Sequence, residues 1–343
     1  MYGILAVTMI ALATAGAAAH TPSTQVDVQV RAEAGEALVT IPGLDIPGGA
    51  IYHHEHEGGD ASVRFAWPAD GWVRGYRIDL VDSAGTLLPR EMLHHVGVVD
   101  LGRRQLPYAK SLRLFAVGRE TEPVLLPESL GVRMTEGDSI LVYYALVSSE
   151  DEPVEDAAIR ITLAWAPVEG HAPKETLPLI MNANPDLMGP SAFDLPPGRS
   201  VTSAEFTLPV GGRLRAAGGH LHDHAVHIRL EDARNGRVLV TLETDLARDG
   251  TLERVDVAHF QLTRGGLRLE ANRTYRVVAV YDNPTGATIP GGAMAYMAGP
   301  FVPDDVGLWP AMDREDPVFL ADFRRLGWSE EEEVAGEHAH YGH

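Results

Sequence analysis

Short runs of alternating apolar and polar residues recur along this 343-residue chain, and most are bounded by glycine, proline or aspartate. Because side chains at i and i+2 share a face of a strand, such runs predict half-buried β-strands. The chain contains 35 glycines and 23 prolines, so long helices are not expected. Short, evenly spaced strands are typical of antiparallel sandwiches. The clearest predicted strands cover residues 61–67, 73–80, 139–147, 158–164, 237–244 and 274–281.

A segment rich in proline, glycine and alanine at residues 166–174 predicts a boundary between two domains. We therefore expect a first β-sandwich over residues 20–167, a linker at 168–174 and a second β-sandwich over 175–303. Residues 304–343 have a weaker pattern and end in an acidic, histidine-containing stretch. They are expected to form a tail.

The N-terminal residues 1–19 have the pattern of a secretory signal peptide. Residues 4–19 are apolar or small, and alanines at 17–19 provide a cleavage site. A stretch of about 16 apolar residues is short for a membrane anchor. We expect an exported protein, periplasmic or extracellular, with no membrane span in the mature chain.

Charge and cysteine content exclude several kinds of partner and site. The formal net charge of −20 argues against binding to nucleic acid. The chain has no cysteine, which excludes thiolate metal sites, cysteine nucleophiles and iron–sulfur clusters. Any metal site must therefore use other ligands, and the 15 histidines are clustered.

The densest histidine cluster is Gly-Gly-His-Leu-His-Asp-His at residues 218–224, followed by an alternating run at 225–230. On one continuous strand, His220 and His222 would lie about 7 Å apart on the same face. That face would also carry Val226, Ile228 and Leu230, the apolar side of the strand. The pair predicts two ligands of one metal ion, and the alternative is a histidine-rich strand whose rings bond to carbonyl groups.

Two further elements carry possible metal ligands. His94 and His95 are adjacent, so both can reach one ion only where a strand is irregular. Met294 follows a Tyr-Asp-Asn-Pro-Thr-Gly segment at 281–286 and a Gly-Gly pair at 291–292. A methionine in a β-protein is usually a core residue, so its assignment depends on the order of all three elements.

In that order, the elements resemble the copper type II, ascorbate-dependent monooxygenases, which include the peptidylglycine α-hydroxylating and dopamine β-monooxygenases. The resemblance extends to the flanking segments at 115–116, 126–133 and 195–198. It implies two jelly-roll-like domains, each with one copper ion. It assigns His220, His222 and Met294 to the oxygen-binding copper, and His94 and His95 to the electron-transfer copper. It also implies O2, a small-molecule substrate, and ascorbate or another reductant.

The sequence departs from the family pattern at three positions. Tyr143 stands where the family has the third histidine of the electron-transfer site, and a neutral phenol is a poor copper ligand. The histidines at 53, 54 and 56 are alternative candidates for that ligand. Gly218 and Ala298 replace the residues that bind peptide substrates in the amidating branch, so peptide amidation is not expected. Three functions remain open: a copper-dependent hydroxylase, a non-catalytic copper-binding protein with one competent His-His-Met site, and a structural sandwich without copper.

Overall fold

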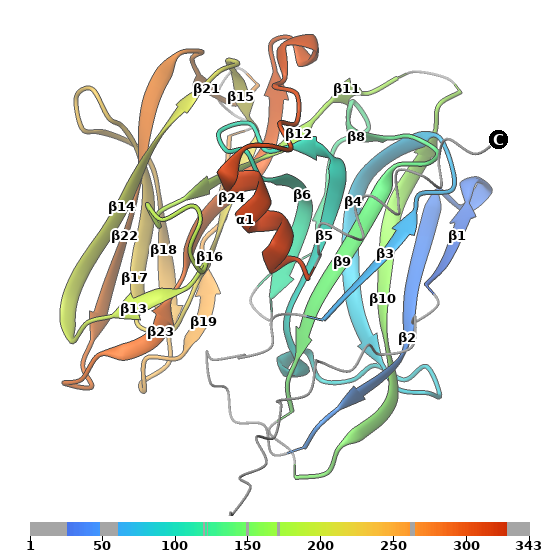
Figure 1. The fold of residues 1–343 in the computed structure, drawn as a ribbon, viewed down its shortest axis with the longest axis horizontal. Coiled ribbons are helices and arrows are strands. Elements are labelled where there is room, and N and C mark those ends of the chain that lie inside the picture. The colour runs from blue at the N-terminus through green and yellow to red at the C-terminus, as the bar shows by residue number, and fades with distance from the viewer. Residues whose placement is uncertain are drawn as a thin grey trace, which may run out of the picture.

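The computed structural model describes residues 26–48, 61–118, 121, 123–148, 151–169, 172–260 and 265–327, which are mostly β-structure (Figure 1). The fold is all-β, with two jelly-roll-like antiparallel β-sandwich domains in tandem, as the sequence predicts. Each of the six clearest predicted strands coincides with a strand of the structure. No helix in the described ranges is long and apolar enough to cross a membrane.

The first sandwich consists of a seven-stranded sheet and a four-stranded sheet that share one apolar core. The larger sheet contains β1 (Asp27–Arg31), β2 (Glu36–Ile46), β10 (Val154–Pro167), β4 (Gly71–Val81), β8 (Leu130–Met134) and β11 (Lys174–Glu175), with β7 (Val124–Leu125) beside β4. The smaller sheet has the order β3 (Ala61–Ala66), β9 (Ser139–Leu146), β5 (Leu93–Arg104) and β6 (Ser111–Gly118). Trp67 and Trp165 pack together in the core, with ring centroids 5.2 Å apart.

The second sandwich pairs a five-stranded sheet with a six-stranded sheet. The first contains β14 (Gly198–Leu208), β22 (Arg273–Asn283), β17 (Ala225–Asp232), β18 (Arg237–Leu246) and β19 (Leu252–Val255). The second contains β20 (Ala258–His259), β16 (Ala216–Leu221), β24 (Ala295–Pro303), β15 (Gly212–Leu214) and β21 (Leu267–Leu269), with β12 (Leu177–Asn182) beside β24. The remaining elements are a small ribbon of β13 (Phe193–Leu195) and β23 (Ile289–Ala293), and the 3-10 helices η1 (Ala32–Ala34), η2 (Arg90–Met92) and η3 (Val306–Leu308).

The two sandwiches share buried residues at their junction. The connection from β5 to β6 inserts Leu106 and Tyr108 into the core of the second sandwich, where they are 0% and 6% exposed. The Tyr108 hydroxyl accepts a hydrogen bond of 3.0 Å from the Asn182 backbone N–H. β11, which begins at the last residue of the expected linker, pairs with β8 of the first sandwich. These contacts attach each sandwich to the other.

The chain beyond β24 returns to the first sandwich, so the folded part of the protein extends past residue 303. The helix α1 (Pro317–Arg325) is capped at its N-terminus by Asp316, whose side chain accepts the Val318 N–H, and has proline in its first turn, a favoured helix start. It lies at the junction of the sandwiches (Figure 1). Leu326, just after α1, packs in an apolar cluster on β5 and β9. Residues 328–343, including the histidine-containing end, lie outside the described residues, as does the expected signal peptide.

Candidate functional site

The His-x-His segment lies at the end of β16, where the chain leaves one sheet for the other. β16 ends at Leu221, Asp223 and His224 form a turn, and β17 begins at Ala225 in the opposite sheet. His224 has a left-handed φ of 65°, which ends the strand. Residues 218–230 are therefore two strands joined by a turn, and the prediction of one continuous strand is wrong.

This break reverses the predicted direction of the histidines. Ala217 and Leu221 are in the core of the second sandwich, and a Cβ atom at Gly219 would lie 3.3 Å from the Ile228 side chain. Positions 217, 219 and 221 thus face the core. By alternation, His220 faces away from the core, and both His220 and His222 line a cavity. The prediction that they share the apolar face of Ile228 is wrong, because the turn places Ile228 in the other sheet.

Strand pairing brings Met294 to the same wall of the cavity. β16 and β24 pair His220 with Tyr296 and Leu221 with Ala295, so His222 and Met294 are the residues just beyond these paired strand ends. Directly opposed residues of an antiparallel pair project to one side. Met294 lines the cavity together with both histidines. The rings of His220 and His222 are perpendicular, with centroids 5.6 Å apart.

A buried hydroxyl group connects the two strand ends that carry these residues. Tyr281, 1% exposed, donates a hydrogen bond of 2.6 Å to the Met294 carbonyl and accepts one of 3.4 Å from the His222 N–H. Burial raises the pKa of the Tyr281 phenol above its usual value, so it remains a donor at any physiological pH. Tyr281 is therefore a positioning residue, which fixes the backbone of His222 relative to that of Met294.

We expect Tyr281→Phe to weaken copper binding at His220, His222 and Met294 by about tenfold, the lower end of the range for residues that orient metal ligands. The matched control is Tyr275→Phe on the same strand. The Tyr275 hydroxyl, also buried, accepts a 2.7 Å hydrogen bond from the Glu270 N–H, away from the cavity. Isothermal titration with copper compares the two variants. Equal copper affinities in both variants would show that Tyr281 has no positioning role.

The other residues of the His-rich segment are held by the following loop. The Asp223 carboxylate accepts a hydrogen bond of 2.8 Å from the Leu252 N–H. The His224 N–H donates to the Gly250 carbonyl, and a Cβ atom at Gly250 would collide with the His224 ring. These contacts anchor the turn. They direct His224 toward the Gly250 loop, away from the cavity wall on which His220 lies.

In the first sandwich, an irregularity of β5 brings His94 and His95 together. β5 pairs Leu93 with Leu146 and His95 with Ala145, so one extra residue, His94, is inserted in β5. Such a bulge turns two successive side chains toward one surface. The two rings have centroids 4.6 Å apart, and both line the same cavity as His220. The sequence indicated that His94 and His95 could share a metal site only where the strand is irregular, and the structure contains such an irregularity.

Tyr143 of β9 lies beside this pair. Its ring is 5.9 Å from the His95 ring and crosses the face of Gly97, where a Cβ atom would collide with it. Gly97 is the directly paired residue on β5, so only glycine leaves room for the phenol. Tyr143 also lines the cavity. The alternative ligands at positions 53, 54 and 56 lie outside the described residues.

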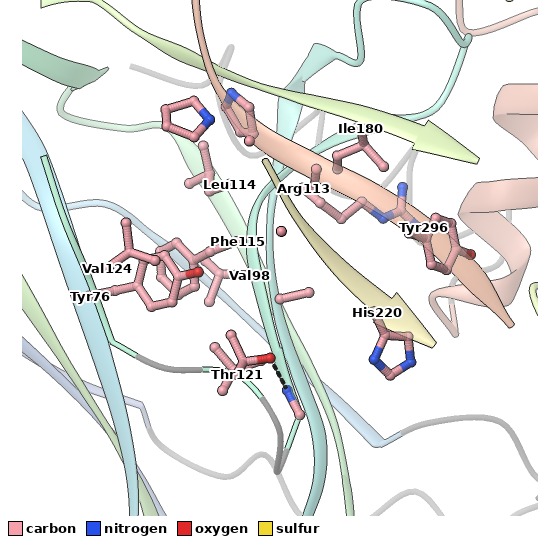
Figure 2. Close-up of a pocket in the computed structure, with 18 of the residues that line it drawn as sticks. Tyr76, Val98, Arg113, Leu114, Phe115, Thr121, Val124, Ile180, His220 and Tyr296 are labelled. Atoms are coloured by element: carbon pink, nitrogen blue, oxygen red, sulfur yellow. Dashed lines mark hydrogen bonds between the residues drawn. The ribbon is translucent and has the colours of Figure 1, made fainter. Parts of the chain in front are cut away.

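The cavity that unites these residues has a volume of about 1080 Å³ and lies between the sandwiches, extending into the first. Many of its lining side chains are apolar. Figure 2 shows Tyr76 and Phe115 stacked on one side, with centroids 4.2 Å apart, and His220 near Tyr296 on another. A cavity this size accommodates a small organic molecule.

The two histidine pairs have spacings compatible with one metal ion each. A ring centroid lies about 3.2 Å from a metal bound at the usual nitrogen distance, so two rings on one ion are at most about 6.4 Å apart. The observed 5.6 Å and 4.6 Å fall within this limit. Imidazole with thioether is a donor set suited to copper. Within the described ranges, no group of three or more His, Cys, Asp or Glu side chains is placed to hold a metal ion.

The polar residues at the end of the cavity near α1 were not identified from the sequence. Lys110, Arg113 and Asp322 lie in the first sandwich and α1, far apart in the sequence. Their proximity depends on the return of the chain after β24. The sequence contains only two lysines, Lys110 and Lys174. This rarity was the one sequence signal that could have drawn attention to Lys110.

No protein-family model matches the sequence, and a comparison with curated proteins finds no match. Solved structures with some likeness include the major capsid protein P2 from bacteriophage PM2, at 13% identity over 77% of this chain and 98% of that chain, with a TM-score of 0.36. A peptide-N(4)-(N-acetyl-β-D-glucosaminyl) asparagine amidase has 11% identity over 77% of this chain and 96% of that chain, with a TM-score of 0.38. These scores are too low to support a functional argument, so the argument rests on the residues of the cavity.

Proposed function

We propose that this chain is an exported copper protein that hydroxylates a small organic substrate with O2 and an external reductant such as ascorbate. In the overall reaction, one oxygen atom enters a C–H bond and the other leaves as water, while the reductant supplies two electrons and, together with the solvent, two protons. The single observation that supports the proposal is the common cavity. A histidine pair from each sandwich, and Met294, line it together.

The proposal gives each group of residues a task. His220, His222 and Met294 would hold the oxygen-binding copper, and His94 and His95 the electron-transfer copper. Copper bound there would supply oxygen activation and electron transfer. Apolar side chains such as Val98 and Leu114 restrict water at the cavity wall (Figure 2). Excluding water protects a reactive centre from side reactions.

The test is the copper content of the purified protein followed by oxygen uptake. We expect two copper ions per chain, and ascorbate-dependent uptake coupled to hydroxylation of a small aromatic amine or acid. Glycine-extended peptides serve as a comparison, because Gly218 leaves the peptide-binding position without a charged side chain. Robust turnover of such a peptide would contradict the assignment to small molecules.

The alternative is a non-catalytic copper-binding protein with one competent His-His-Met site. The observation in its favour is Tyr143, which lies beside His95 where the family has a histidine. A first site with two imidazoles and a phenol would hold copper weakly. One tightly bound copper per chain, with no turnover of any substrate, would support this alternative and contradict the hydroxylase.

A further inference from the structure

Lys110 is a buried cation at the end of the cavity near α1. It precedes β6, lines the cavity and is only 7% exposed. Among the described residues, no hydrogen bond or ion pair engages its ammonium group. A buried ammonium group has three donors to satisfy and is costly without partners. Such a group is expected where a ligand supplies the missing acceptor.

The carboxylate with the largest electrostatic effect on Lys110 is already engaged by other groups. Asp322 of α1 accepts two hydrogen bonds from the Arg113 guanidinium, at 2.5 and 2.7 Å, and a third from the Ser111 N–H at 3.2 Å. This arrangement uses most of the acceptor capacity of Asp322. The carboxylate therefore compensates Arg113 and leaves Lys110 with only a longer-range attraction.

The second nearby carboxylate is also engaged. Asp186, in the loop after β12, accepts hydrogen bonds from the backbone N–H groups of Met188 and Gly189. Arg325 of α1 adds another positive charge and donates to the Met188 carbonyl. Among the described residues, the charged groups with the largest effect on Lys110 are these two carboxylates and two guanidinium groups. Together with Lys110, these groups carry one positive charge in excess.

The positive end of the cavity is continuous with the wall that carries His220. Arg113 lies near Tyr296, and the Tyr296 ring stacks against His220 with centroids 6.5 Å apart (Figure 2). Leu114 and Ile180 line the space close to Arg113 (Figure 2). A ligand anchored at Lys110 would therefore have its body against apolar side chains and near His220.

We propose that Lys110 is the anion-recognising group of this cavity, and that it binds the carboxylate of a small organic ligand with an apolar body. A single excess positive charge matches a monoanion. The apolar lining favours a ligand whose remaining atoms are hydrocarbon. The identification of this ligand as the substrate of the enzyme rests on the proposed function. The binding of the ligand at Lys110 does not depend on that function.

The protonation of Lys110 supports this assignment. Burial lowers the pKa of Lys110 to about 8. The negative charge of Asp322 opposes this shift, the positive charges of Arg113 and Arg325 increase it, and the negative charge of Asp186 again opposes it. A bound carboxylate stabilises the charged ammonium and raises its pKa. By linkage, carboxylate affinity is highest below pH 8 and falls as the pH rises above that value.

The presence of only two lysines allows a direct test by NMR on the copper-free full-length protein. Lysine labelled with ¹³C at Cε gives one signal for Lys110 and one for the exposed Lys174, assigned with Lys174→Arg. The probe is 3-phenylpropanoate, and the matched neutral compound is 3-phenylpropanamide. We expect the acid to shift the Lys110 signal saturably and to raise its titration midpoint above about 8. The amide should do neither, and the Lys174 signal should not respond.

Two variants test the same proposal by calorimetry, without the NMR signals of the lysines. Lys110→Met replaces a buried ammonium with an apolar side chain of similar length, so it should fold, and calorimetry should show the acid binding about tenfold more weakly or worse. Lys174→Met should bind like the wild type. Unchanged affinity in Lys110→Met, or a Lys110 signal that responds to inorganic phosphate but not to the acid, would overturn the proposal. Binding of the acid by a protein that turns over no substrate and holds one copper ion would leave this site intact and contradict only the proposed function.

Discussion

Replacing His222 by alanine is expected to remove copper from the second sandwich and to abolish hydroxylation, without unfolding the protein. His222 lies just beyond the end of β16, and its backbone N–H donates to Tyr281, a contact that alanine preserves. Loss of an imidazole ligand should reduce copper affinity by at least about 100-fold, more than the loss of an orienting residue. Copper analysis of the purified variant, with circular dichroism for the fold, measures both effects.

The control is His227→Ala. His227 belongs to β17, in the other sheet, and contacts Arg229 at 2.9 Å. It is a histidine of the same sandwich that does not line the cavity. Its replacement should leave copper content and oxygen uptake unchanged. If His222→Ala retained the copper content of the wild type, the assignment of His220, His222 and Met294 to a copper site would be wrong.

The second large effect is expected at the contact between α1 and the first sandwich. Asp322 is 1% exposed and pairs with Arg113, whose guanidinium is mostly buried. Asp322→Asn would leave Arg113 without a charged partner beside the buried Lys110. Breaking a buried pair by removing one partner costs about 3–5 kcal/mol. We expect the free energy of unfolding, from urea titration followed by tryptophan fluorescence, to fall by that amount.

Two further variants distinguish this explanation from a general loss of packing. Asp79→Asn removes one partner of the more exposed pair with Arg77, 2.8 Å apart, and should cost less than about 1 kcal/mol. The double variant Arg113→Met with Asp322→Leu replaces both buried charges by apolar groups and should recover much of the lost stability. If Asp322→Asn destabilised the protein no more than Asp79→Asn, the pair would not hold α1 in place.

The strands were predictable because their pattern is local. In residues 139–147 and 274–281, alternation between apolar and polar side chains reflects which face of one strand is buried, and β9 and β22 occupy these positions. The same reasoning failed at residues 218–230. A turn of two residues, with His224 in a left-handed conformation, separates two strands that belong to different sheets. The alternation of residue types continues across the turn in the sequence, but the residues before and after the turn do not lie on the same face of one sheet.

The helix α1 illustrates a different limit. Its cap, Asp316 followed by proline, is a local signal, but a short helix of nine residues depends on packing for its stability. Phe319 and Phe323 are buried, and Asp322 bonds to a residue more than 200 positions earlier. A segment at the end of the sequence that looks like the start of a tail therefore becomes part of the cavity wall.

The sequence by itself determined the all-β class, the division into two sandwiches, and the choice of His220, His222, Met294, His94 and His95 as candidate ligands, because these depend on residue type and local spacing. Only the tertiary structure decided that both histidine pairs line one cavity. That outcome depends on the β16–β24 register, on the bulge at His94 and on the insertion of Leu106 and Tyr108 into the second sandwich. The burial of the Lys110 ammonium, which no described residue engages, likewise arises from packing, since the groups around it come from segments distant in the chain.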